Sequence, residues 1–275
     1  MERGYRGEVV VGSSIDHFLL SLGDVEDLFL DGHASVLKSS RSTRAVLVTM
    51  SMPPSELSSG AEFTTEKVFA KKYLFKNLLH SFKPLLLQHR SRVVWDLSWY
   101  LRSHGVSVPE PAGYLVRQTG PVCLAGYFFS EAISDCRSLL EWAKRPEVSR
   151  FRPEWKDVMD LVAHHVAAMH EGGVTHGDLK WSNILFDGSQ GRPWLVDLDS
   201  AKYHDLRLDP RRVARDLARF VLNALDLGEG DVCDCFLDGY ARRRNLSRQL
   251  LDESMDRVLH KLVERHRRRD LARRK

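Results

Sequence analysis

The chain has 275 residues, of which 43% are hydrophobic and 28% charged, with a formal net charge of +4. This composition is typical of globular proteins, and the length allows one two-lobed domain or two small domains. No stretch approaches the roughly 20 apolar residues that span a bilayer. The first residues lack the apolar core of a secretory signal, so we expect a cytoplasmic protein. The four cysteines have neither zinc-like spacing nor a disulfide pattern, and we expect free thiols.

The positive charge is concentrated at the C-terminal end of the sequence. Residues 257–275 contain nine Lys or Arg and two Asp or Glu. A basic tail of this kind can bind an anionic membrane surface or, without sequence preference, nucleic acid. A solvated helix end, whose basic residues suit the negative end of the helix dipole, explains the pattern as well. No alternation of aromatic and basic residues indicates specific nucleic-acid binding.

The first half of the chain is predicted to be rich in β-strands. Apolar alternation and flanking turn residues predict two strands within residues 34–50, around the loop Ser39–Thr43, and a third at Val68–Tyr73. Further along, the expected elements are helices at Leu74–Leu79 and 85–104, with Gly105 as the stop signal, and strands at 112–117 and 123–129.

The pattern becomes helical after Glu131. Apolar residues at helical spacing predict a helix at 155–170, after a short one at 138–142. Two short strands, 184–186 and 194–196, follow, and everything from Pro210 onward is predicted helical. The fold class is therefore α+β, with a β-sheet lobe first and a helical lobe second. We assign residues 1–130 to the N-lobe, 131–256 to the C-lobe and 257–275 to a basic helical tail.

The motif His176-Gly-Asp178-Leu-Lys180-Trp-Ser-Asn183 lies between the long helix and these short strands. Its spacing reproduces that of the kinase loop H-R-D-L-x-x-x-N, in which the Asp is the general base and the Asn binds a metal ion. Asp197 ends an apolar run, where a strand would deliver a second oxygen ligand. Mg²⁺ prefers oxygen ligands, so we predict an ATP-dependent kinase in which Asn183 and Asp197 hold Mg²⁺.

Two other residues of the motif have predicted roles. Lys180, two residues after the base, can offset the charge of the γ-phosphate. We expect His176 to hold the loop by hydrogen bonds. Asp199 is either a second metal-facing acid or a cap for the next segment.

A lysine on a strand of the N-lobe should bind the nucleotide phosphates. Lys71 fits this role because three apolar residues precede it, with Lys72 as the reserve. Such a lysine usually pairs with a Glu on the following helix. The helix at 85–104 has no Glu at the expected place, and its only acidic residue is Asp96. Either Asp96 takes this role or no pair forms. The loop at 39–43 has no glycine, yet Ser39, Ser40 and Arg41 can offer N–H groups and charge to phosphates.

Taken together, these motifs resemble the lipopolysaccharide core kinase family, the Kdo and heptose kinases. The resemblance runs from about Ala34 to Phe220. Softer signals besides the loop are Ser91-Arg-Val-Val-Trp95, Gly105-Val-Ser-Val-Pro-Glu-Pro111, Tyr127-Phe-Phe-Ser-Glu131 and Arg215-Asp-Leu-Ala-Arg219.

The resemblance implies a bilobal protein-kinase-like fold and transfer of phosphate from ATP to a sugar of an anionic glycolipid at the inner face of the cytoplasmic membrane. It also implies that main-chain groups of the hinge at Glu131–Ile133 bind adenine.

Three alternatives remain open from the sequence. A RIO-like protein kinase and an aminoglycoside- or choline-type phosphotransferase share the His-Gly-Asp motif. A pseudokinase scaffold would have lost the base or a metal ligand, and both are present. Arginines in the C-terminal helical region favour an anionic acceptor, namely Arg207, Arg211, Arg212, Arg215, Arg219, Arg242, Arg243, Arg244 and Arg248; solvated helix faces explain them equally well.

Overall fold

The structure is a computed structural model that describes residues 4–10, 19, 24–30, 34–40, 42–52, 64–74, 89–119, 122–144, 153–187, 191–204 and 208–273. Arg41, Arg207 and most of the helix expected at Leu74–Leu79 lie outside the described residues. Contacts divide the chain into a first unit, Met1–Trp99 with Pro109–Ser134, and a second unit, Tyr100–Val108 with Asp135–Lys275.

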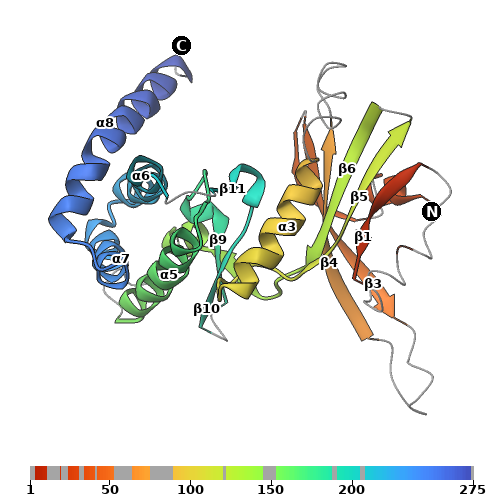
Figure 1. The fold of residues 1–275 in the computed structure, drawn as a ribbon, viewed down its shortest axis with the longest axis horizontal. Coiled ribbons are helices and arrows are strands. Elements are labelled where there is room, and N and C mark those ends of the chain that lie inside the picture. Colours follow the sequence, from red (N-terminus) through yellow and green to blue (C-terminus); the bar gives the residue numbers. More distant parts are fainter. Residues whose placement is uncertain are drawn as a thin grey trace. The chain divides into compact units, whose positions relative to one another are not determined.

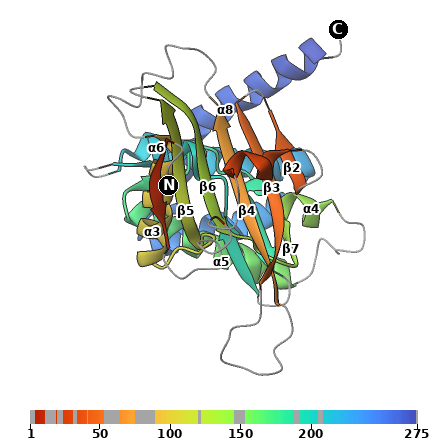
Figure 2. The same ribbon diagram turned by 90° about the vertical axis from the view of Figure 1, so that its right-hand side faces the viewer.

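The first unit is built on a six-stranded antiparallel sheet. In spatial order its strands are β1 (Tyr5–Val9), β5 (Pro111–Thr119), β6 (Val122–Glu131), β4 (Thr64–Leu74), β3 (Thr43–Met52) and β2 (Ser35–Ser39). Figure 2 shows them side by side. Every strand predicted for this half is present; β1, which pairs with β5, was not predicted.

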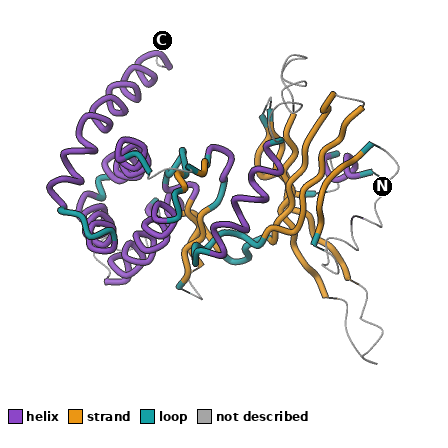
Figure 3. The backbone as a smooth tube through the Cα atoms, in the orientation of Figure 1, coloured by secondary structure: helices purple, strands orange, loops and turns teal. Residues whose placement is uncertain are grey.

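Different elements cover the two faces of this sheet. On one face the short 3-10 helix η1 (Val25–Phe29) packs its buried Val25, Leu28 and Phe29 against the strands. On the other face lies helix α3 (Arg90–Ser103), as Figure 3 shows, with the Trp95 ring 5.9 Å from that of Tyr114. Side chains alternate between faces along a strand, so neighbouring residues of β4 meet different surroundings.

The second unit is mainly helical, as predicted. Its helices are α4 (Leu139–Ala143), α5 (Pro153–Glu171), α6 (Pro210–Leu227), α7 (Gly230–Arg243) and α8 (Arg248–Arg273), and α5 packs against α7 and α6 against α8 (Figure 1). Strands β7 (Cys136–Ser138), β9 (Ile184–Asp187) and β10 (Arg192–Leu195) form one small sheet, and β8 (Val174–Thr175) with β11 (Lys202–Tyr203) forms another. None of the described helices is long and apolar enough to cross a bilayer.

The segment before Pro109 is tied to the helical unit by a buried polar cluster. The backbone N–H of Ser107 donates to Nδ1 of His165 at 3.2 Å, and Nε of Arg192 donates to the Ser107 hydroxyl at 2.9 Å. Ser107 O accepts from the N–H of Leu195 on β10. Burial, together with the charges of His164 and Arg192, lowers the pKa of His165 to about 4.

The buried histidines should make stability fall in acid. His89, in the first unit, also has its pKa lowered to about 4, by burial and by Arg90. An unfolded histidine, with a pKa near 6.5, binds more protons than these two between pH 6.5 and 4, so lower pH favours unfolding in that window. We expect each to cost about 1–2 kcal/mol between pH 7 and pH 5.

Urea unfolding at the two pH values checks this. His165→Gln should reduce the loss on acidification, whereas substitution of the exposed His260 should leave it unchanged. An equal loss in wild type and His165→Gln would contradict the assignment.

Candidate functional site

The His176-Gly-Asp178 motif forms a loop in the second unit whose backbone conformation requires glycine at position 177. It follows β8 and leads into the 3-10 helix η3 (Trp181–Asn183) and then β9. Gly177 has φ 76°, and a Cβ there would lie 2.4 Å from Ser200 O, so no larger residue fits without a shift. His176 is fully buried, its Nε2 lies 3.1 Å from Val196 O, and burial lowers its pKa. A neutral His176 that donates to Val196 thus links the loop to the strand end before Asp197.

Asp216, which the sequence analysis did not single out, holds the backbone of this loop. It lies on α6 with 1% of its surface exposed. Its carboxylate accepts the N–H of His176 at 2.7 Å and that of Gly177 at 2.9 Å. His170 Nε2 lies 3.5 Å from the same carboxylate, and Nδ1 of His170 lies 2.8 Å from the Tyr240 hydroxyl. One buried carboxylate therefore fixes the residues immediately before Asp178. An acid on the buried face of an amphipathic helix was the available signal.

The Asp178 carboxylate lies between two basic side chains. Lys180 donates to its Oδ2 at 2.8 Å, and Arg219 of α6 donates to its Oδ1 at 3.4 Å. Burial raises the pKa of Asp178, but the hydrogen bond and charge of Lys180 and the charge of Arg219 outweigh this, so the pKa lies below its ordinary value. Asp178 is therefore ionised at neutral pH and able to accept a hydrogen bond from a hydroxyl. Lys180 was expected near the base; the contact of Arg219 was not.

The two predicted metal ligands lie just outside the paired strands β9 and β10: Asn183 ends η3 directly before β9, and Asp197 lies two residues after β10. Asn183 Nδ2 donates to the Asp178 carbonyl at 3.0 Å, and Val196 N–H donates to the Asn183 carbonyl at 3.0 Å. Ile184 and Leu195 then pair across β9 and β10, so Asn183 and Asp197 stand at the same end of this hairpin. Asp197 has φ 62°, a left-handed conformation that non-glycine residues adopt rarely and often at functional sites. One amide oxygen and one carboxylate are a donor set that suits Mg²⁺.

In the first unit, β4 sends its two candidate lysines to opposite faces. Lys72 points to the η1 face and forms an ion pair with Glu26, which Arg117 also approaches at 3.2 Å. Lys71 is 5% exposed and its Nζ lies 5.6 Å from the centre of the Tyr73 ring, on the face that α3 covers. Lys72 is thus occupied in a structural cluster, which favours Lys71 as the phosphate-binding candidate. Glu26 lay in a segment for which the sequence analysis made no prediction.

The other residues of the N-lobe that were predicted to serve the nucleotide site, Asp96, Ser39 and Ser40, form contacts of their own. Asp96 pairs with Arg92 at 3.7 Å within α3, and no contact with Lys71 is recorded for it in the described part of the chain. The N–H of Ser40 donates to Thr43 O, and the Ser40 hydroxyl accepts the N–H of Thr43 at 3.1 Å. The hairpin turn between β2 and β3 uses these groups, and the contribution of Ser40 to phosphate binding stays a prediction. Ser39 pairs with Arg44 at the end of β2.

Glu131, expected at the hinge, ends strand β6. Its carboxylate accepts the N–H of Glu110 at 3.0 Å, and its own N–H donates to Glu110 O. The side chain therefore braces the start of β5, while adenine binding was assigned to main-chain groups of Glu131–Ile133.

An antiparallel sheet that carries a buried lysine, followed by a helical unit with a His-x-Asp loop, is the arrangement of the protein-kinase-like fold. The structure of WaaP in complex with acyl carrier protein has a TM-score of 0.63 to this chain, at 20% identity, and covers 93% of this chain and 99% of that one. This similarity confirms the predicted α+β, bilobal kinase-like fold.

The model of the lipopolysaccharide kinase (Kdo/WaaP) family matches residues 57–240, two thirds of the sequence, and the chain belongs to that family. A 3-deoxy-D-manno-octulosonic acid (Kdo) kinase of Stenotrophomonas maltophilia (strain K279a) is 33% identical over 157 residues, 56% of this chain and 58% of that protein. A protein of the same name from Vibrio vulnificus (strain CMCP6) is 31% identical over 116 residues, 40% and 43% of the two chains. The matches thus span about half the length of these curated relatives.

Asp216→Ala should disorder the loop of the His176-Gly-Asp178 motif, which we call the catalytic-type loop. It removes the acceptor of two buried N–H groups, and we expect a loss of about 3 kcal/mol in the free energy of unfolding, measured by urea denaturation. Asp216→Asn, which keeps one acceptor oxygen but turns an NH₂ toward a donor, should lie in between. Asp256→Ala, at an exposed position of α8, is the control and should match wild type. An Asp216→Ala variant as stable as the control would show that the carboxylate does not hold the loop.

Proposed function

We propose that this chain transfers the γ-phosphoryl group of ATP to a hydroxyl of Kdo in the lipopolysaccharide inner core. The observation that carries the proposal is the Asp178 carboxylate, kept ionised by Lys180 and Arg219 in a loop that Asp216 fixes. Membership of the lipopolysaccharide kinase family supports a core sugar as acceptor. The relatives named Kdo kinases favour Kdo over heptose.

In this proposal Asp178 orients the acceptor hydroxyl and receives its proton. The hydroxyl oxygen forms a bond to the γ-phosphorus, the bond between that phosphorus and the β–γ bridging oxygen breaks, and ADP leaves. Lys180, 2.8 Å from Asp178, then offsets the negative charge of the transferred group. Arg219 supports the ionised form of Asp178 from the other side.

We assign nucleotide binding and metal binding to separate sets of candidate residues. Asn183 and Asp197 would hold Mg²⁺, which when bound neutralises phosphate charge and orients the γ-phosphoryl group. Lys71 is our candidate for binding the nucleotide phosphates, since Glu26 occupies Lys72. Main-chain groups of Glu131–Ile133 are the candidates for adenine.

The first test is transfer of label from γ-labelled ATP with Mg²⁺ to a panel of acceptors. The panel holds a Kdo-bearing lipid A precursor, a heptose-bearing one, a generic protein and an aminoglycoside. Label on the Kdo acceptor is the expected result. Label on the heptose acceptor alone would reassign the substrate from Kdo to heptose. Label on the protein alone would indicate a protein kinase instead of a sugar kinase.

Asp178→Asn should reduce transfer by at least about a thousandfold while leaving ATP affinity within about twofold of wild type. The amide cannot accept the proton, whereas the candidate phosphate- and metal-binding groups remain. Single-turnover kinetics and fluorescent-nucleotide titration measure the two effects separately. Equal losses of ATP binding and transfer would argue against the role of Asp178 as the base.

We also propose that the C-terminal end of α8 contacts an anionic membrane surface, since a glycolipid acceptor is membrane-bound. The basic residues of this segment whose side chains are described are exposed: Arg257, Lys261, Arg265, Arg267 and Arg268. Each basic residue near an anionic surface contributes about 1 kcal/mol.

Truncation after Glu264 should weaken binding to vesicles that contain anionic lipid, with the largest difference at low salt. Sedimentation with vesicles at two salt concentrations measures this, and vesicles of neutral lipid alone serve as the control. Equal vesicle binding by the full-length and the truncated chain would show that the segment is a solvated helix end and not a membrane contact.

A further inference from the structure

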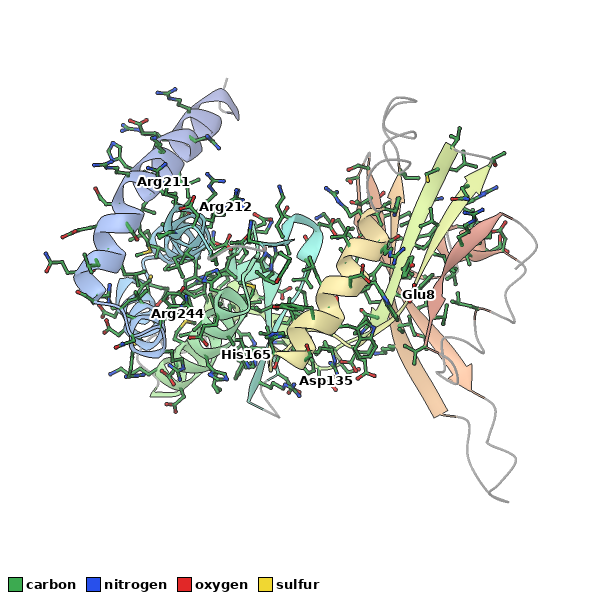
Figure 4. The ribbon with its side chains drawn as sticks, in the orientation of Figure 1. Glu8, Asp135, His165, Arg211, Arg212 and Arg244 are labelled. Atoms are coloured by element: carbon green, nitrogen blue, oxygen red, sulfur yellow. The ribbon has the colours of Figure 1, made fainter. Side chains whose placement is uncertain are left out.

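Seven of the nine arginines that suggested an anionic acceptor separate into two groups in the structure; Arg207 lies outside the described residues and Arg219 contacts Asp178. Arg242 and Arg243 pair with Asp160, Arg244 with Glu171, and Arg248 with three aspartates of α7 and α8. These four hold helices together. By contrast, Arg211 and Arg212, both labelled in Figure 4, and Arg215 are exposed on α6. None of the three forms an ion pair within the described residues. We call these three the arginine face of α6.

The arginine face borders the side of α6 that holds the catalytic-type loop. Successive residues of a helix are about 100° apart, so Arg211, Arg215 and Arg219 form a row in which each is rotated by about 40° from the last. Arg219 ends the row with its contact to Asp178 at 3.4 Å. Asp216 and Asn223, on the adjoining stripe, bind the loop through the N–H groups of His176, Gly177 and Trp181. A row of guanidinium groups thus leads along the helix to the candidate base.

Helix stability does not account for arginines at this position. They lie in the first two turns of α6, the positive end of the helix dipole. The N-cap Asp209 accepts the backbone N–H of Arg211 at 2.9 Å, and the first turn itself contains no acidic residue. Arg211 and Arg215, four residues apart, also repel each other. Dipole and side chains together favour an anion at this surface, and guanidinium groups bind carboxylate and phosphate oxygens in pairs.

We propose that the arginine face binds an acidic group of the acceptor, a carboxylate or a phosphate, at a distance from the hydroxyl that reacts. This inference rests on the proposed function, because it concerns the acceptor of the same site. Measured along the helix axis, Arg215 and Arg211 lie about 6 and 12 Å before Arg219. Arg215 therefore reaches an acid on the reacting sugar or its neighbour, and Arg211 reaches one further away.

The test compares Arg211→Gln/Arg215→Gln with Lys144→Gln/Lys156→Gln. The control removes the same charge from two exposed positions of the helical unit, at the end of α4 and on α5. With a deacylated, water-soluble Kdo acceptor, the α6 variant should raise the acceptor KM at least about tenfold. Its kcat and its KM for Mg-ATP should stay within about twofold of wild type, and thermal melts should coincide. The control should match wild type throughout.

Two modified acceptors identify the acidic group. In one the phosphates are removed, and in the other the Kdo carboxylates are converted to amides. Removing the group that the arginine face binds should raise the wild-type KM about tenfold and abolish the difference between wild type and the α6 variant. Loss of the difference with the first acceptor assigns a phosphate; loss with the second assigns a carboxylate.

The outcomes separate the inference from the proposed function. Wild-type transfer to the glycolipid with an unchanged acceptor KM in the α6 variant would overturn the inference alone. The same holds if only kcat or the KM for Mg-ATP changes, or if neither modified acceptor removes the difference. No wild-type transfer to any glycolipid would overturn both.

Discussion

The geometry of the candidate site depends on the buried carboxylate of Asp216. A loop that must present a base cannot satisfy its own N–H groups through a helix or a sheet, and buried N–H groups without acceptors are costly. Asp216 accepts two of them in succession, from His176 and Gly177, and so sets the direction of the chain one residue before Asp178. Because α6 also supplies Arg219 to the Asp178 carboxylate, one helix fixes the position of the candidate base and, together with Lys180, favours its ionised form.

The sequence predicted the loop and its neighbours well because their spacing is local. Asp178, Lys180 and Asn183 lie within six residues, and Asp197 follows a strand that pairs with the one after Asn183. Asp216 and Arg219 were missed as site residues although they stood within a quoted motif. An acid on the buried face of α6 indicates a buried partner, but the sequence does not show that this partner is a loop 38 residues earlier. Only the packing of α6 on the loop shows it.

The choice between Lys71 and Lys72 shows a second limit of sequence reasoning. Alternation predicts that the two point to opposite faces, but it cannot say which face is which. The structure distinguishes them through η1, which delivers Glu26 to Lys72, to Arg117 and to the Tyr127 hydroxyl. The bonds to Lys72 and Tyr127 overcome burial and lower the pKa of Glu26, so this cluster is a closed charge network. The partner came from residues 1–30, where the strand and helix signals were too short to be predicted.

Charge composition alone also could not separate structural arginines from functional ones. Eight of the nine arginines that suggested an acidic ligand lie on α6 or close to the α7–α8 connection, and their sequence context does not distinguish them. In the structure Arg243 and Arg248 neutralise carboxylates of α5 and α7, whereas no ion pair of the Arg211 or Arg215 guanidinium is found among the described residues. The N-cap Asp209 accepts the backbone N–H of Arg211 and not its side chain. A positive charge that the fold leaves without an internal carboxylate, at a helix end that already favours anions, is where an external anion binds with least competition. The physical distinction is therefore the partner rather than the residue type, and it points to the α6 arginines as the part of the basic surface that serves the acceptor.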